Sequence, residues 1–306
     1  MATVTNPDAT TLAISIETRP ALVASRQALL ALLQRDLTVL RKNIIEFVTR
    51  TLVQPFLLVF VFLYVFPTIG QGVGSTPRVG ESVAQAESVF ATILVAGVVG
   101  IAIMFQGIQA VAMQMAQEFG YTREIEDRVQ APCPVWLVAM AKVISGAIQG
   151  LIAAVIVFPI ADVVHAKGVH AHLSVHWVVL LTVLPLACLT FSALGLFLGT
   201  RFEPRNLGLM FGFVVLPITF LGGTYYAWTA LRPVHLGGFH WLQVLVLANP
   251  LIYVTEGMRA ALTNASIFPN PHSAHMHLYV VYPALLASLG LFLFLGLRGF
   301  RRRVLA

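Results

Sequence analysis

The chain has 306 residues, of which 58% are hydrophobic and only 10% are charged. Soluble domains carry about 25% charged residues, so 19 basic and 13 acidic side chains are too few to cover the surface of a soluble protein of this length. The composition excludes a disordered chain and argues strongly against a soluble enzyme. It predicts a membrane protein with several spans.

The N-terminal part is polar and then amphipathic. Residues 1–20 are predicted to be a disordered cytoplasmic tail, and residues 21–303 to form a single transmembrane domain. Within 21–44, Leu29, Leu33, Leu37 and Leu40 recur at helical spacing, whereas the basic residues lie off that stripe. This pattern predicts a helix along the inner membrane surface, or one packed on a soluble partner.

Six apolar stretches of about 20 residues follow, each long enough to cross the bilayer as a helix. They lie at about 51–69, 90–113, 135–161, 177–200, 207–226 and 278–297. Because alternating apolar and polar residues are missing from these stretches, strands of a barrel are a poor alternative. Lys142 lies near the inner end of the third stretch and is expected to reach the headgroups. Three GxxxG spacings permit close helix contact, namely Gly146/Gly150, Gly195/Gly199 and Gly208/Gly212.

Basic residues set the orientation of the spans. With the N-terminus inside, 15 of the 19 lysines and arginines fall on the cytoplasmic side, and only Arg78, Lys167, Arg232 and Arg259 fall outside. Both termini are therefore predicted to be cytoplasmic. The same asymmetry accounts for the isoelectric point of about 9.7 without a nucleic-acid partner.

The histidines have the opposite distribution, since all nine fall in segments predicted to lie outside. They are His165, His170, His172, His176, His235, His240, His272, His275 and His277. They could form an external metal site or proton sensor, or they could simply be polar loop residues. Because no acidic partners converge near them, we expect no metal site.

The loop between the second and third stretches concentrates charge in Glu118, Arg123, Glu124, Glu126, Asp127 and Arg128. Gly120 ends the second stretch, Tyr121 follows it, and Thr122 can cap a new helix whose first turn holds Glu124. The result would be a short charged helix under the membrane. On its own, this segment is also compatible with a solvated connector.

Residues 227–277 form a long outer segment with two apolar stretches, 241–248 and 250–261, that are too short to span. They predict a pair of interfacial or re-entrant helices between the fifth and sixth spans. Glu256 and Arg259 are spaced i, i+3 and can pair on one helix face. Such a pair could be structural or could line a substrate exit.

Two motifs make the chain similar to the type-2 ABC export permeases, in the branch of daunorubicin-type drug exporters and nodulation-factor exporters. The first is the segment from Glu118 to Glu124, followed by Pro132 and Lys142. The second is the segment Asn249-Pro250-Leu251-Ile252-Tyr253 followed by Arg259. The segment Tyr225-Tyr-Ala-Trp-Thr, which begins at the end of the fifth stretch, departs from the family, which more often has a Phe-Pro pair after that span.

The resemblance implies a permease subunit in the bacterial inner membrane that moves a hydrophobic or amphipathic substrate out of the cell. It implies two ATPase subunits that hold ATP and Mg, and a second permease chain, identical or related. Residues 118–131 would be the coupling helix and 21–44 the connecting helix. Residues 227–262 would be a re-entrant helical hairpin between the fifth and sixth spans. The chain is expected to have no catalytic residues, and it contains no GxxxxGK[ST] phosphate loop. Alternatives are a secondary carrier or channel without an ATPase, and a membrane-embedded enzyme.

Overall fold

The computed structural model describes residues 21–69, 83–120, 134–163, 173–234, 238–263 and 275–304. Within these ranges the chain is almost entirely helical, and Leu173 and Thr263 pair in an isolated antiparallel bridge. Six helical segments are long and apolar enough to cross a membrane. The predicted all-α membrane protein with six spans is therefore confirmed.

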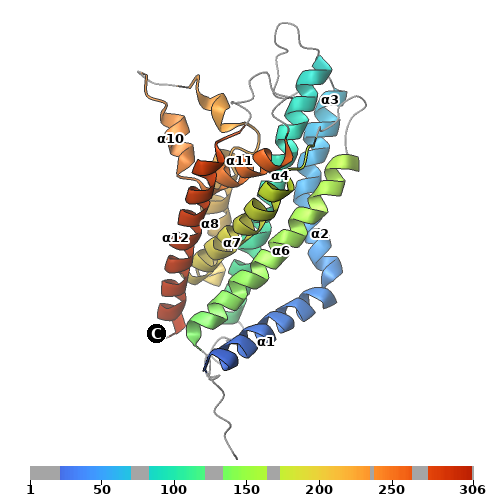
Figure 1. Cartoon of the computed structure of the whole chain (residues 1–306). Coiled ribbons are helices and arrows are strands. Elements are labelled where there is room, and N and C mark those ends of the chain that lie inside the picture. The colour runs from blue at the N-terminus through green and yellow to red at the C-terminus, as the bar shows by residue number, and fades with distance from the viewer. Residues whose placement is uncertain are drawn as a thin grey trace, which may run out of the picture.

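The N-terminal helix α1 (Ala21–Lys42) lies across one end of the bundle, obliquely to the spans (Figure 1). A break at Asn43 separates it from the first span, which consists of α2 (Ile44–Val59), a π-helical segment η1 (Phe60–Val65) and α3 (Phe66–Thr68). The first span thus begins earlier than the predicted residue 51. The prediction started after Arg50, the last charged residue, whereas the helix already includes Glu46 and Arg50.

The second, third and fourth spans are long continuous helices, α4 (Val83–Gly120), α6 (Val135–Val163) and α7 (Trp177–Arg201). The sixth is α12 (Leu278–Val304). The fifth comprises η2 (Pro204–Asn206), α8 (Leu207–Met210), the π-helical η3 (Phe211–Val215) and α9 (Leu216–Leu221). It ends before the predicted residue 226, because Gly223 adopts a φ of 67° and turns the chain.

Helix α4 forms the centre of the bundle and packs against α6, α7 and α11. Glycines allow the close approach, since a Cβ at Gly195 would lie 3.0 Å from the carbonyl oxygen of Gly107 on α4. Gly199 and Gly146 face α4 in the same way. In contrast, a Cβ at Gly208 or Gly212 would meet nothing within 4 Å. Two of the three GxxxG spacings therefore pack helices within this chain.

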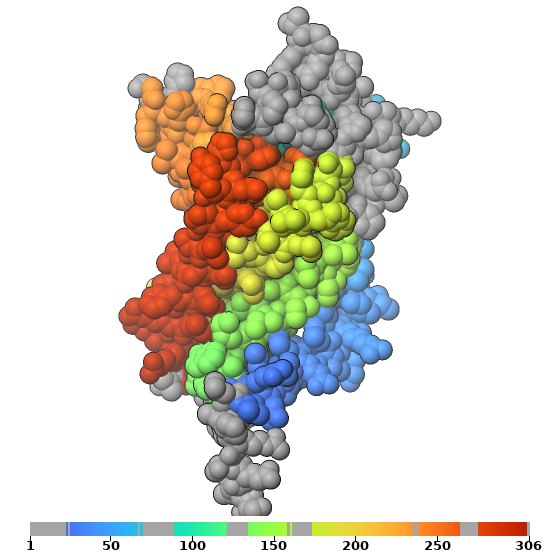
Figure 2. All heavy atoms as spheres, viewed as in Figure 1, coloured from blue at the N-terminus to red at the C-terminus, as the bar shows by residue number. Residues whose placement is uncertain are grey.

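The two ends of the molecule differ. Helix α1 and the C-terminal end of α12 lie at one end, whereas α10 (Trp241–Leu247) and α11 (Pro250–Leu262) lie at the other (Figures 1 and 2). The short helix η4 (Trp228–Leu231) connects the fifth span to α10. The predicted pair of short helices between the fifth and sixth spans is present at these positions. The end that carries α1 is called the basic end below, because the arginines of α1 and the last turns of α12 lie there.

Candidate functional site

At the basic end, α4 ends at Gly120, where the charged segment of the sequence begins. Of the residues predicted to contact an ATPase, Glu118 and Gly120 belong to α4, whereas Tyr121, Thr122, Arg123, Glu124, Glu126, Asp127 and Arg128 lie outside the described residues. The residues 1–20 that were predicted as a tail also lie outside them. Within the predicted coupling region, the structure therefore describes the end of α4.

Lys142 of α6 is buried beside this helix end, with only 3% of its surface exposed. Its Nζ atom lies 2.7 Å from Oε1 of Glu118 and donates to Oε1 of Gln114 at 3.2 Å. Oδ2 of Asp36 on α1 lies 3.6 Å away. The expectation that Lys142 extends to the headgroups is wrong, because two carboxylates within the protein offer its charge a better environment than the membrane interface.

Two further elements, η2 and α12, also pack against the end of α4. A Cβ at Gly120 would collide with the ring of Pro204 in η2. The Phe119 ring packs edge-on against Phe300 of α12, with centroids 5.8 Å apart. The guanidinium of Arg303 lies 4.6 Å from the centroid of the same ring. Together with the Lys142 cluster, these contacts join the end of α4 to α1, α6, α12 and η2.

Buried glutamines extend the polar interior from this end toward the middle of the bundle, a feature that the sequence analysis missed. Gln106 of α4 accepts a hydrogen bond from Thr51 at 3.0 Å and donates to Gln149 of α6 at 3.4 Å. A buried amide needs such partners in an apolar bundle. The occurrence of glutamine inside otherwise apolar stretches was the signal that could have found them.

At the opposite end, the predicted signature residues build a helical hairpin. Asn249 caps α11 by accepting a hydrogen bond from the amide of Leu251 at 2.9 Å, and its amide group donates to the carbonyl of Ile218 at 2.7 Å. Pro250 occupies the first helical position, where no amide donor is required. The hydroxyl of Tyr253 donates to the carbonyl of Leu247 at 2.7 Å, which fixes α11 against α10.

Glu256 and Arg259 form a fully buried ion pair of 2.9 Å on α11. The carboxylate of Glu256 also accepts hydrogen bonds from the amides of Trp228 and Met276, both at 2.7 Å. Arg259 donates to the carbonyl of Gly223 in the turn after the fifth span. Burial lowers the pKa of Arg259, and the charge of Glu256 opposes that shift. These contacts make the pair a structural junction of the fifth span, α11 and the segment before α12.

Four histidines lie in the described residues, namely His176, His240, His275 and His277, and each directly or closely precedes a helix at the hairpin end. The ring of His277 stacks on Tyr279. No group of three potential metal ligands occurs within the part of the chain that the structure describes. The other five fall outside it, and they are His165, His170, His172, His235 and His272.

Both regions fall within the part of the chain that matches a known family. The family model of the ABC-2 type transporters matches residues 27–263, from α1 to the end of α11. The chain belongs to this family. The resemblance inferred from the two motifs is therefore confirmed, and the match spans the Lys142 cluster and the hairpin alike.

Several relatives in enteric bacteria share one name. The inner membrane transport permease YadH of Escherichia coli K12 is 28% identical over 213 residues, which cover 69% of this chain and 74% of that protein. The protein of the same name in Shigella flexneri matches equally well. With the six apolar helices, these relatives identify a multi-pass protein of the bacterial inner membrane.

Membership of the ABC-2 family identifies the chain as a membrane permease component of an ABC transporter and implies association with ATPase subunits. In this setting the two regions have different characters. The hairpin is joined to its neighbours by buried hydrogen bonds. The end of α4 is a charged helix terminus that contacts several other elements.

Proposed function

We propose that this chain is the transmembrane subunit of an ATP-driven exporter for a hydrophobic or amphipathic substrate, such as a drug, a lipid or a glycolipid. Two ATPase subunits would bind ATP and Mg²⁺ and supply the energy, so the chain itself needs no catalytic residue. A second permease chain, identical or related, would complete the pathway. Membership of the ABC-2 family is the observation that carries this proposal.

Residues 121–128, with Glu118 and Gly120, would form the contact that the ATPase moves. The connections of the α4 end support this role. Because Glu118 binds Lys142 of α6, and Lys142 lies beside Asp36 of α1, a displacement of the loop would be passed to three helices at once. Buried ion pairs are costly to break, so these helices are expected to move together rather than separately.

The second chain would contact the fifth span. This span is poorly covered within the chain, and Phe213 and Phe220 are 78% and 62% exposed. Gly208 and Gly212 lie on it, and a Cβ at either would meet no atom of the described residues within 4 Å. Small residues of this kind favour close helix association in membranes, which supports pairing through this span.

Purification of the tagged chain from bacterial membranes in mild detergent tests the proposal. The particle is expected to contain an ATP-binding cassette subunit, and its mass should correspond to two permeases and two ATPases. Replacing Glu124 and Glu126 by lysine should release the ATPase subunits, because the loop would then carry positive charge in place of its acidic face. A chain that is purified alone and transports solute in liposomes on an ion gradient would instead be a secondary carrier.

A further inference from the structure

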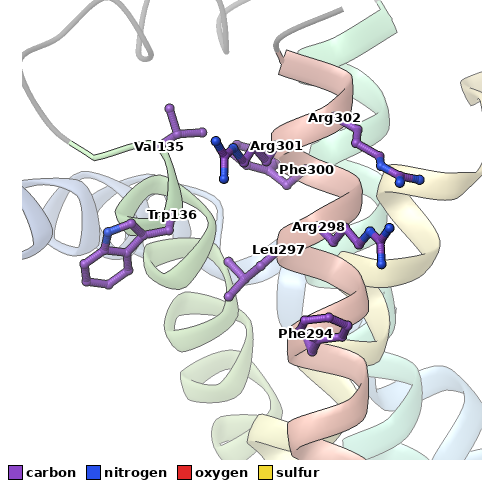
Figure 3. A pocket seen from close by; sticks show the side chains of 8 residues that line it. All are labelled: Val135, Trp136, Phe294, Leu297, Arg298, Phe300, Arg301 and Arg302. Carbon is purple, nitrogen blue, oxygen red and sulfur yellow. The ribbon is translucent and has the colours of Figure 1, made fainter.

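A groove of about 940 Å³ opens between the first turn of α6 and the last turns of α12, at the basic end of the molecule (Figure 3). Trp136 forms part of the α6 wall, and Phe294 and Leu297 form the apolar part of the α12 wall. Arg298, Arg301 and Arg302 line the groove nearer to the end of α12. The groove is therefore apolar toward the middle of the span and cationic toward its end.

The three groove arginines are exposed, and within the described residues none of them has an ion pair or a side-chain hydrogen bond. Their neighbour Arg303 differs, because it donates to the carbonyls of Gly199 and Phe202 and packs on Phe119. Arg303 thus binds backbone carbonyls near the end of α7, whereas the other three arginines are exposed and line the groove.

No acidic side chain lines the groove among the residues that the structure describes. Figure 3 shows Arg298 and Arg302 extending from one side of α12, with Arg301 closer to the start of α6. Guanidinium groups bind phosphate through paired hydrogen bonds. The exposed indole of Trp136 is of the type that favours the membrane interface.

We propose that this groove binds an anionic phospholipid, with its phosphate at the groove arginines and its acyl chains along Phe294, Leu297 and Trp136. Basic pockets between membrane helices on the cytoplasmic side bind anionic headgroups in this manner. Neither wall of the groove belongs to the poorly covered fifth span on which we place the second permease. The lipid is therefore a separate partner that anchors the ends of α6 and α12 to the inner leaflet.

Fluorescence quenching of Trp136 tests the proposal with the full chain in detergent micelles. Brominated phosphatidylglycerol and brominated phosphatidylcholine are titrated separately, and the difference between wild type and Trp136→Phe isolates the emission of Trp136. We expect a preference for phosphatidylglycerol, so that half-quenching by this lipid needs a roughly tenfold lower concentration than half-quenching by phosphatidylcholine. The triple variant Arg298→Gln/Arg301→Gln/Arg302→Gln should reduce this preference to about twofold or less.

The matched control is Arg41→Gln/Lys42→Gln/Arg50→Gln, which removes three exposed cations from α1 and α2 at the same end. This control variant should keep the full, roughly tenfold preference for phosphatidylglycerol over phosphatidylcholine. Equal quenching by the two lipids in wild type, or the same loss in the control, would overturn the proposal. Competition by soluble glycerol phosphate at the lipid's own concentration would also overturn it, because the site would then bind a free phosphate. If the triple variant does not fold, Arg298→Gln/Arg302→Gln should still lower the preference about threefold.

Discussion

Replacing Arg259 by leucine is expected to destabilise the protein by about 3–5 kcal/mol, the usual cost of removing one partner from a buried ion pair. Glu256 would keep two backbone donors but lose its cation, in a site where both side chains are fully buried. The turn at Gly223 would lose a donor as well. The free energy of unfolding, measured by titrating mixed micelles with a denaturing detergent, reports the effect.

Two further variants distinguish the pair from a general arginine effect. Arg232 is exposed at the same end, so Arg232→Leu should change stability by about 0.5 kcal/mol or less. The double variant Glu256→Leu/Arg259→Leu should be less destabilised than Arg259→Leu alone, because no unpaired charge remains. A single variant as stable as wild type would show that the junction does not hold the hairpin.

Replacing Lys142 by methionine is expected to have the second large effect, again about 3–5 kcal/mol, because Glu118 would lose its buried cation. The neutral triple variant Asp36→Asn/Glu118→Gln/Lys142→Met should recover most of that stability, since no charge is left buried. Stability and coupling can therefore be separated at this cluster.

In the proposed transporter, the neutral triple variant should remain folded, but it should couple the permease less tightly to the ATPase subunits. Its ATP hydrolysis in the reconstituted complex is expected to fall about tenfold toward the rate of the ATPase subunits alone, within the usual range of coupling energies. Unchanged hydrolysis in this folded variant would show that the cluster only stabilises the bundle.

Much of the fold could be predicted from the sequence, because span boundaries follow from hydropathy. The hairpin helices were predicted to within one residue, since Asn249 and Pro250 mark the start of α11 unambiguously. The end of the fifth span was placed too late, because the apolar residues up to Tyr226 outweighed the turn signal of Gly222 and Gly223.

The partners of Lys142 could not be predicted. Hydropathy shows that a lysine lies in a span, but it does not show which face of α6 meets α1, so Asp36 could not be assigned to it. The i, i+3 spacing did predict the pair of Glu256 and Arg259. Local spacing thus predicted contacts within one helix, whereas contacts between helices depended on packing at Gly107, Gly146 and Gly195.

Photo-crosslinking from two tyrosine positions tests the central claim most directly. A photoreactive phenylalanine analogue is placed at Tyr121, in the proposed ATPase contact, or at Tyr279, which is 74% exposed at the opposite end. In bacterial cells that also express the ATPase subunit, the proposed transporter predicts an adduct with that subunit from position 121 and none from position 279. An adduct from position 279, or none from position 121 in a folded chain, would contradict it.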